Sequence, residues 1–468
     1  MKRLLHFSYR SLKRLLILLV VGLGLLIILG RLLAPMAAQY RAEVEEWTSD
    51  LLGQPITVGR LRGDWRGLGP VLVLYDLQLI DPERNTPTLY LSEVRIALDL
   101  LSSLRQLSPV VRKVSFVSPR LRVIRQGNGA ITVGNLDQLN QLEPGDGSSA
   151  FLLPAHLSLV NGEVIWEDLM SGAPPLRLTQ VDLKLRNGGN RHQLDGSLTL
   201  PGSRGGSLQL AVDLNGRLDQ PGSWRARSYT RSQGIDLAFL LNRRVARDYR
   251  FSNRQAEIEL WGEWDQDGLI SLQGSTDWEQ VQISRRGRRP EQPDPALKLD
   301  RLTTELRLLR LERGWQLDLD QLEIRRNNNR WPESRISLRA TQGDSGAWEL
   351  AAGSQHTRIE DVSAISVLIP IADRSLEQGL QQIQASGSLN DLKLRFREQA
   401  DGFSWEAHGR LSDFSSQPWN DLPGLDNLAL TFWMDPDQGT LALDSRDVSV
   451  TFRELFRDPL QLERLAGE

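Results

Sequence analysis

The stretch Leu392-Lys393-Leu394-Arg395-Phe396-Arg397 alternates strictly between apolar and basic side chains. Successive side chains of a β-strand point to opposite faces of a sheet, so this period of two gives one dry face and one wet face. A helix would instead place apolar residues three and four positions apart. An antiparallel sheet with one face in water produces this alternation. The stretch therefore predicts a strand of a one-sided antiparallel sheet.

The same alternation returns along most of the chain after Ile56, with turn residues between the alternating segments. Asn161-Gly162 and Asn187-Gly188-Gly189 are two of these predicted turns. Helical patterns are few and short, and they fall at Asp236 to Arg244, Ser363 to Ile369 and Leu376 to Ile383. The sequence thus predicts a mainly β protein. The other alternating segments are Val71-Val73-Tyr75-Leu77-Leu79, Leu208-Leu210-Val212-Leu214, Leu428-Leu430-Phe432 and Val448-Val450-Phe452.

The composition excludes several classes of function. The 468 residues include 56 basic and 59 acidic side chains, which are well mixed and give a net charge of −3. Nucleic acid is therefore not a predicted partner, because phosphate binding needs a concentrated basic face. The chain has no cysteine, which excludes disulfides, thiolate zinc sites and cysteine nucleophiles. Its five histidines are scattered, so no metal site and no cofactor are predicted.

No motif of a known catalytic class is present, so the chain is not predicted to be an enzyme and no catalytic residue is assigned. The neighbouring acids Glu167 and Asp168 point to opposite faces of a strand and cannot converge on a substrate. Asp265 and Asp267 could share a face, but nearby glycines favour a turn. We therefore interpret Asp265 and Asp267 as acidic residues of a turn and not as a catalytic pair.

An apolar segment near the N-terminus decides the predicted compartment. Leu15 to Gly30 has no polar side chain, and extension to Leu33 approaches the roughly 20 residues that cross a bilayer. A cleaved signal peptide is the alternative, but Ala34-Pro35-Met36-Ala37-Ala38 lacks a clean A-x-A site. We predict a basic cytoplasmic flank at 1–14 and a transmembrane helix at 15–33. The anchor candidates are Leu15, Leu18, Leu19, Leu23, Leu26 and Ile27.

Residues 34–53 are predicted to form a juxtamembrane amphipathic helix, which Gly53 and Pro55 end. Docking of this helix on the following sheet is favoured over a position on lipid. Residues 54–468 are predicted to be an extracytoplasmic β domain. A strand near Asp447 to Phe452 and the start of another near Pro459 predict that this domain is incomplete at the C-terminus.

The dry face of so long a sheet must be covered, and the predicted helices are too few to cover it. Two solutions remain open: a second sheet packed over the first, or an apolar ligand in a curled trough. Each acyl CH₂ removed from water contributes about 0.8 kcal/mol, so a trough could hold a lipid tail.

Several short segments are specific enough for comparison with a known family. They are Gly53-Gln54-Pro55-Ile56-Thr57-Val58-Gly59-Arg60-Leu61-Arg62-Gly63-Asp64-Trp65-Arg66-Gly67, Gly69-Pro70, Asp76-Leu77-Gln78-Leu79, Val114-Ser115-Phe116, Ser118-Pro119-Arg120-Leu121-Arg122-Val123 and Leu260-Trp261-Gly262-Glu263-Trp264.

Together with the preceding apolar segment, these residues resemble the AsmA-like proteins of the YhdP branch. The resemblance implies a single-pass inner-membrane protein with a cytoplasmic N-terminus and a periplasmic bulk. It also implies phospholipid movement toward the outer membrane, with phospholipid, the inner membrane and other envelope proteins as partners. Members of this branch are much longer, so the chain resembles an N-terminal portion.

The combined prediction is an N-terminal transmembrane helix followed by a long, curled antiparallel β-sheet groove with a few short helices. This groove would hold phospholipid acyl chains for transport between the inner and outer membranes. The alternative is a structural or assembly factor for the outer membrane, a packed β-sandwich that binds proteins. A degraded carbohydrate-binding or hydrolytic β-protein is a third alternative. The groove candidates are Val71, Val73, Leu208, Leu210, Val212, Leu392, Leu394, Phe396, Leu428, Leu430 and Phe432.

Overall fold

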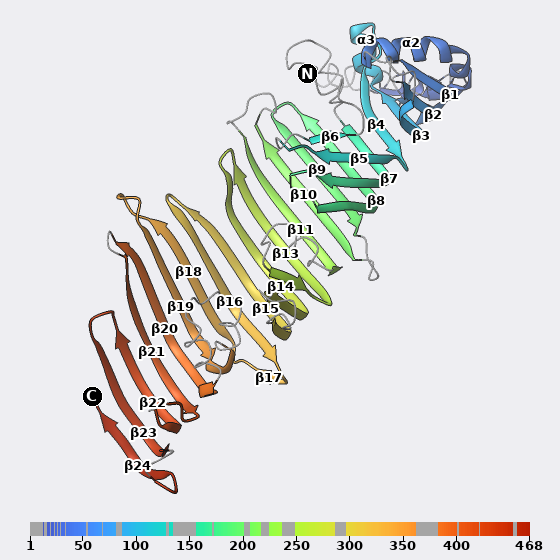
Figure 1. The fold of residues 1–468 in the computed structure, drawn as a ribbon. Helices are drawn as coiled ribbons and strands as arrows, with labels where there is room; N and C mark the ends of the chain where they lie inside the picture. The colour runs from blue at the N-terminus through green and yellow to red at the C-terminus, as the bar shows by residue number, and fades with distance from the viewer. Residues whose placement is uncertain are drawn as a thin grey trace. The chain divides into compact units, whose positions relative to one another are not determined.

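The computed structural model divides the chain into two compact units (Figure 1). Unit 1 comprises Met1–Ser203 and Ser207–Trp224, and unit 2 comprises Arg204–Gly206 and Arg225–Glu468. Both units are mainly β. The described residues are 13, 16–18, 20–22, 24–25, 27–28, 30–32, 34–52, 55–67, 69–80, 87–127, 131–133, 156–170, 173–200, 206–216, 224–235, 249–285, 296–361, 382–399, 402–420, 422–452 and 456–468.

The described strands of unit 1 form a single layer. Successive strands pair as neighbours from β1 to β4, and again from β7 to β10. The strands are β1 (Ile56–Arg66), β2 (Gly69–Ile80), β3 (Pro87–Leu98), β4 (Val111–Val117), β5 (Arg120–Arg125), β6 (Ile131–Val133), β7 (His156–Asp168), β8 (Ala173–Gly188), β9 (Arg191–Thr199) and β10 (Ser207–Asn215).

The sheet is antiparallel as expected except on one side of β7. Both β4 and β5 run parallel to β7, with Phe116 beside Leu159 and Val123 beside Trp166. The strands β4 and β5 are interrupted only by Ser118 and Pro119, so together they cover one side of β7. A parallel partner requires a long connection, and the 22 residues between β6 and β7 (134–155) are present in the chain but lie outside the described residues.

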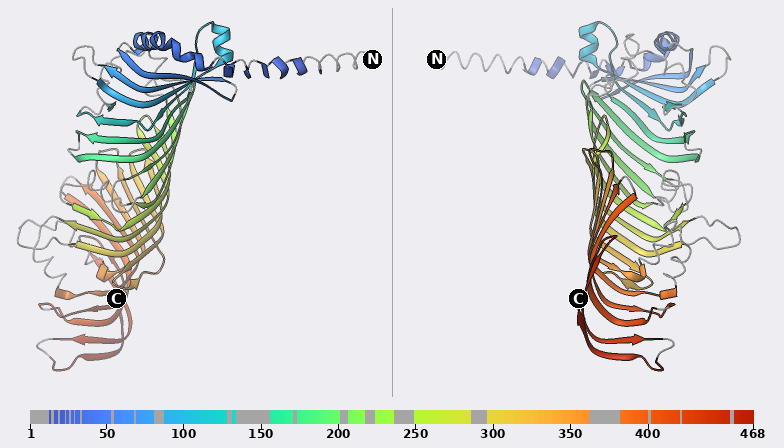
Figure 2. Two further views of the ribbon diagram at one scale, coloured as in Figure 1. Left: turned by 90° about the vertical axis from the view of Figure 1, so that its right-hand side faces the viewer. Right: turned by 60° about the vertical axis from the view of Figure 1, so that its left-hand side comes forward.

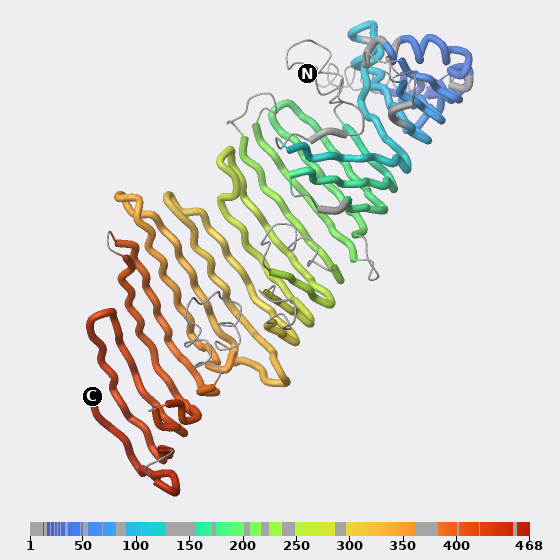
Figure 3. Tube along the Cα trace, in the orientation of Figure 1, coloured from blue at the N-terminus to red at the C-terminus, as the bar shows by residue number. Residues whose placement is uncertain are grey.

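Unit 2 is a single antiparallel layer of successive hairpins (Figure 3). The short β12 pairs with one end of β14, and β17 pairs with the end of β16. The strands are β11 (Arg225–Ile235), β12 (Tyr249–Ser252), β13 (Gln255–Asp265), β14 (Gly268–Arg285), β15 (Ala296–Leu311), β16 (Gly314–Arg326), β17 (Asn329–Arg330), β18 (Ser334–Gln342), β19 (Trp348–Arg358), β20 (Ser386–Gln399), β21 (Gly402–Ser416), β22 (Gly424–Met434), β23 (Gly439–Thr451) and β24 (Leu460–Gly467).

The predicted turns have different outcomes. Asn187, Gly188 and Gly189 lie at the β8–β9 turn, where Gly189 has a φ of +60°. Asp265 lies at the β13–β14 turn, and its Oδ1 accepts the backbone N–H of Asp267 at 2.9 Å. The Asn161-Gly162 prediction is wrong, because this dipeptide lies inside β7.

Asn161 instead belongs to a series of positive-φ residues that lie in the middle of strands. At such a residue the strand bends and two consecutive side chains face the same side, as in a β-bulge. The long strands accordingly curve along their length (Figure 2). Asn and Asp tolerate this left-handed conformation better than most residues. We call the positive-φ residues that lie inside strands the kink residues. They are Asp76, Asn161, Gln180, Gly234, Gln280, Gln321, Asp391, Asp413, Asn427 and Asp447.

Helices η1 (Ala34–Tyr40) and α2 (Arg41–Leu52) precede β1, and α2 covers the free edge of that strand. The Ser49 hydroxyl accepts the Ile56 N–H at 2.9 Å, and Oε1 of Glu45 accepts the Val58 N–H at 2.7 Å. Arg41 donates to the Gly59 carbonyl at 3.3 Å. An uncovered edge would be free to pair with another chain, so these bonds protect it.

A third helix, α3 (Leu100–Gln106), joins β3 to β4. Asp99 caps it, because its Oδ1 accepts the Ser102 N–H at 3.1 Å. That hydrogen bond to the charged form lowers the pKa of Asp99.

The N-terminal segment is helical at every described residue from 13 to 32. Within the part of the chain that the structure describes, no helix reaches the length and apolarity of a membrane span. Of the anchor candidates, Leu18 and Ile27 are helical. The other four, Leu15, Leu19, Leu23 and Leu26, lie outside the described residues, as do the predicted helices at 236–244 and 363–369.

Candidate functional site

The candidate site in unit 2 is the apolar face of its sheet, which we call the inner face. One row of residues paired in register crosses six strands from β16 to β22 and contains no polar side chain. A second row lies two residues away along each strand and is richer in large side chains. The first row is Leu317, Leu338, Ala352, Leu394, Ala407 and Met434, and the second is Trp315, Ala340, Leu350, Phe396 and Trp405.

On one side of the strand bends, this inner face is exposed to solvent. Phe403 is 72 % exposed and Leu350 is 48 % exposed, although both are large and apolar. Soluble monomers seldom group so many exposed apolar side chains, and such patches mark binding surfaces. Other exposed members of the same face are Trp315, Leu338, Trp348, Phe396 and Leu441.

The kink residues mark the deepest line of the inner face. The residue after each kink residue and the residue two before it face inward, and several of them are almost fully buried. In β16, Leu322 follows the kink residue Gln321 and is 1 % exposed. In β23, Ser445 and Val448 flank Asp447 and are 1 % and 0 % exposed. The bend at a kink residue therefore turns the two halves of that strand toward each other on the apolar side.

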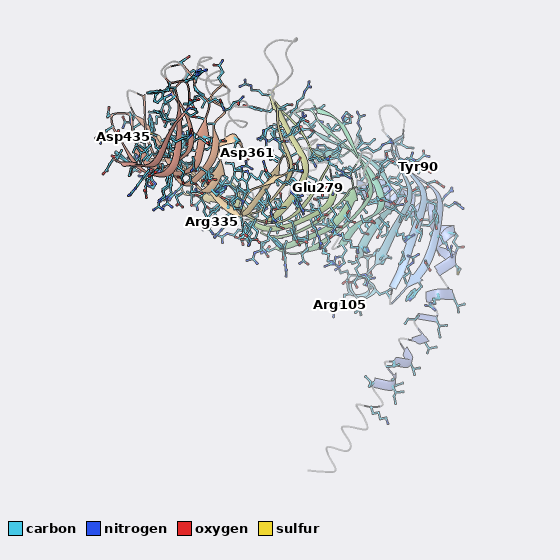
Figure 4. All side chains as sticks on the ribbon, turned by 90° about the horizontal axis from the view of Figure 1, so that it is seen from below. Tyr90, Arg105, Glu279, Arg335, Asp361 and Asp435 are labelled. Carbon is cyan, nitrogen blue, oxygen red and sulfur yellow. The ribbon has the colours of Figure 1, made fainter. Side chains whose placement is uncertain are left out.

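The opposite face of unit 2, which we call the outer face, carries cross-strand ion pairs. Arg301 Nη2 lies 2.5 Å from Asp277 Oδ2, and Arg395 Nε lies 3.3 Å from Glu349 Oε1. Glu279 and Arg335, labelled in Figure 4, belong to this face. Exposed ion pairs contribute only about 0–1 kcal/mol each, so they make the face soluble more than they stabilise it.

The corresponding apolar face of unit 1 is its inner face, and its exposure changes along the sheet. Leu74, Val58 and Val94 form a closed cluster with exposures of 0 to 3 %. Val44 of α2 and Leu121 of β5 pack against this cluster. Toward β10 the inner residues are only half-buried. The apolar face is thus sealed beside β1 and open beside β10.

The structure places nine of the eleven groove candidates on an inner face. In unit 1 these are Leu208, Leu210 and Val212, which pair with Leu198, Gly196 and Leu194. In unit 2 they are Leu392, Leu394, Phe396, Leu428, Leu430 and Phe432. Leu428 and Phe432 are buried, whereas Phe396 is 39 % exposed.

Val71 and Val73 do not join the inner face. They are buried on the opposite face of β2, paired with Asp64 and Arg62. The kink at Asp76 is the reason, because Leu72 and Leu74 face inward before it and Leu77 faces inward after it. Following every second residue through the kink therefore selects the wrong side of the strand.

Sequence reasoning also missed several exposed inner residues, chiefly Trp315, Leu350 and Phe403. The sequence does contain a pattern that marks inward-facing residues. An apolar residue lies one position after an Asn, Gln or Asp, and another lies two positions before it. Leu319-Asp320-Gln321-Leu322 shows it.

No metal-binding group of His, Asp or Glu occurs among the described residues. A hydrogen bond from Arg310 lowers the pKa of Asp265, which ties the end of β15 to the β13–β14 turn. Many charged side chains that the structure describes make cross-strand ion pairs of this kind, such as Arg301 with Asp277 and Arg395 with Glu349.

The chain is thus a protein of the single-layer curled β-sheet type, with an apolar face that is partly exposed to solvent. The chain belongs to the YhdP protein family, whose model matches residues 1–468. It is 25 % identical to the "Intermembrane phospholipid transporter YhdP" of Escherichia coli over 468 aligned residues. That alignment covers 95 % of this chain and 35 % of the relative, so the chain spans about a third of the relative's length. No solved structure matches it.

Proposed function

We propose that this chain is a membrane-anchored lipid-transfer protein that holds phospholipid acyl chains on its inner faces. The transfer would run between the inner and outer membranes of the envelope. The observation that carries the proposal is the pair of apolar rows that start on β16 and end on β22 and β21, because several of their large side chains face solvent. The name of the E. coli relative describes transport of the same lipid class.

The energetics suit a carrier. Each acyl CH₂ that leaves water contributes about 0.8 kcal/mol, so even a partly covered tail is held by several kcal/mol. Neighbouring strands offer similar apolar contacts, because the rows repeat from strand to strand. A tail can therefore move along the sheet with little change in free energy, while its headgroup stays in water.

The proposal includes the anchor. Residues 15–33 would cross the inner membrane, 1–14 would remain cytoplasmic, and 54–468 would form one periplasmic groove domain. Support comes from the apolar side chains of the helical segment, of which Leu18 is 71 % exposed and Leu32 is 69 % exposed. Exposed leucines on an isolated helix require an apolar surrounding such as lipid.

Native mass spectrometry of the full chain tests the function. The unsubstituted protein is expected to retain phospholipid, and the double variant Leu350→Asp/Phe396→Asp, which changes the inner face of unit 2, is expected to retain less. These residues are paired in register and partly exposed, so the sheet can tolerate the change. The matched control is Gln355→Asp/Gln399→Asp, which places the same charges on the outer face of the same strands.

Equal lipid retention in the two double variants would refute the inner face as the binding surface. A lipid-free mass for the unsubstituted chain would instead favour a structural or assembly role in the outer membrane. Circular dichroism of each variant confirms that the sheet is intact.

A further inference from the structure

A basic hollow lies beside β1, the edge strand of unit 1. Its volume is about 850 Å³, and η1, α2, β1 and β2 form its walls. Arg41, Arg60 and Arg62 line it together with Tyr75. The residues that line it, all in the described part of unit 1, include no Asp or Glu.

Local contacts hold two of the three arginines. The guanidinium carbon of Arg60 lies 5.2 Å from the ring centroid of Tyr75, a cation–π arrangement. Arg41 donates from Nη1 to the Gly59 carbonyl, and its Nε lies 3.8 Å from Glu45. Arg62 is exposed on the same strand. A guanidinium has five N–H donors, so each of these side chains keeps donors for a ligand.

The chemistry of this hollow selects a phosphate. Planar guanidinium groups bind phosphate oxygens in pairs, and three of them without a lining carboxylate favour an anion. The position of the hollow indicates that this phosphate belongs to a membrane lipid. The helix η1 begins at Ala34, and at about 2 Å per residue Gln39 lies roughly 10 Å beyond Ala34 along the helix. An arginine side chain near that position can reach the headgroup zone of a bilayer, which is about 5–8 Å thick on each side.

We propose that Arg41, Arg60 and Arg62 bind the phosphate headgroup of an anionic phospholipid in the leaflet next to the anchor. This inference rests on the membrane anchor of the proposed function. The bound lipid differs from the transported one, because Arg60 and Arg62 lie on the face of the sheet opposite Leu74 of the inner face. The site would orient the sealed end of unit 1 on the membrane surface.

Photo-crosslinking in nanodiscs tests the site. The full chain carries a benzophenone amino acid at position 39 and is inserted into phosphatidylcholine discs with a minor share of phosphatidylglycerol. Mass spectrometry then identifies the crosslinked lipids. We expect phosphatidylglycerol to be enriched several-fold over its share of the disc. Arg60→Gln/Arg62→Gln should reduce the adducts to that share.

The matched control is Arg105→Gln/Arg112→Gln, which removes the same charge from unit 1 outside the hollow (Figure 4). It should leave the enrichment unchanged. Adducts that mirror the bulk lipid in the unsubstituted chain, or equal losses in both double variants, overturn the proposal.

Failure of this site and failure of the proposed function give different results. Lipid on the inner face is measured by native mass spectrometry of the same samples. Arg60→Gln/Arg62→Gln should keep that lipid while it loses the enrichment. If enrichment persists in a chain that carries no inner-face lipid, the carrier proposal fails and the headgroup site stands.

Discussion

The indole ring of Trp65, near the tip of the β1–β2 hairpin, lies against Gly30 of the preceding helical segment. A Cβ atom at position 30 would overlap three ring atoms of that indole. The hairpin and the helical segment can approach this closely only because position 30 has no side chain. This contact connects the proposed anchor to the sheet.

Gly30→Ala should therefore displace Trp65 and loosen the β1–β2 hairpin. Overpacking of this kind costs about 1–3 kcal/mol, which should appear as faster hydrogen–deuterium exchange in peptides that cover residues 60–75. Gly22→Ala is the control, because nothing lies within 4 Å of a Cβ at that position. Unchanged exchange in Gly30→Ala would show that the hairpin does not depend on this contact.

Asp361 provides a buried test of unit 2. It accepts the Trp331 Nε1–H at 2.6 Å and an Arg326 guanidinium N–H, and it is 6 % exposed. Asp361→Ala leaves a partly buried arginine without its partner, so unfolding should become easier by about 3–5 kcal/mol. The urea midpoint measures this. Asp344→Ala breaks the exposed pair with Arg313 and should shift the midpoint little.

The kink residues make a prediction about backbone conformation. Gln280 in β14 has a φ of +49° and is exposed, so it can be changed without loss of packing. Gln280→Val should lower the free energy of unfolding by about 1–2 kcal/mol, because a β-branched residue is strained in this region. Gln280→Gly should be tolerated.

Gln273→Val is the matched control for this kink. It lies in the same strand and is also exposed, but its backbone is extended, so valine should be neutral or slightly favourable there. Equal effects at positions 273 and 280 would show that the kink contributes no conformational constraint.

The Asp265–Arg310 contact predicts a pH dependence. Arg310 donates a hydrogen bond to Asp265 and lowers the pKa of that carboxyl below its ordinary value of 3.8. A lowered pKa in the folded state gives stability that is complete above the unfolded pKa and is lost as the pH falls through the lower folded value. The free energy of unfolding should therefore decrease below about pH 4.

Asp265→Asn should flatten this acid dependence, whereas Asp267→Asn should keep it. Urea unfolding at a series of pH values between about 2 and 6 measures this difference in slope, because that range brackets the pKa of about 3.9 of an unperturbed Asp. An identical slope in all three proteins would show that Asp265 does not carry the effect.

Local residue patterns were enough to predict a mainly β fold and to assign most of the inner-face residues. Alternation of apolar and polar residues is a local property, because neighbouring side chains of a strand must point to opposite sides. Leu210, Leu394 and Leu430 could therefore be assigned to one face without knowledge of their neighbours. Asp265 could likewise be assigned to a turn from the glycine three positions later.

Three features could be seen only in the folded chain: where the alternation changes side, which strands pair, and which apolar residues remain exposed. Val71 and Val73 were misplaced because the kink at Asp76 depends on how β2 bends within its sheet. The parallel pairing of β7 depends on segments that are distant in sequence. Leu74 is fully buried and Phe403 is largely exposed, although both follow the same pattern. Burial depends on curvature and on the neighbours that a strand acquires, and neither is a property of the strand alone.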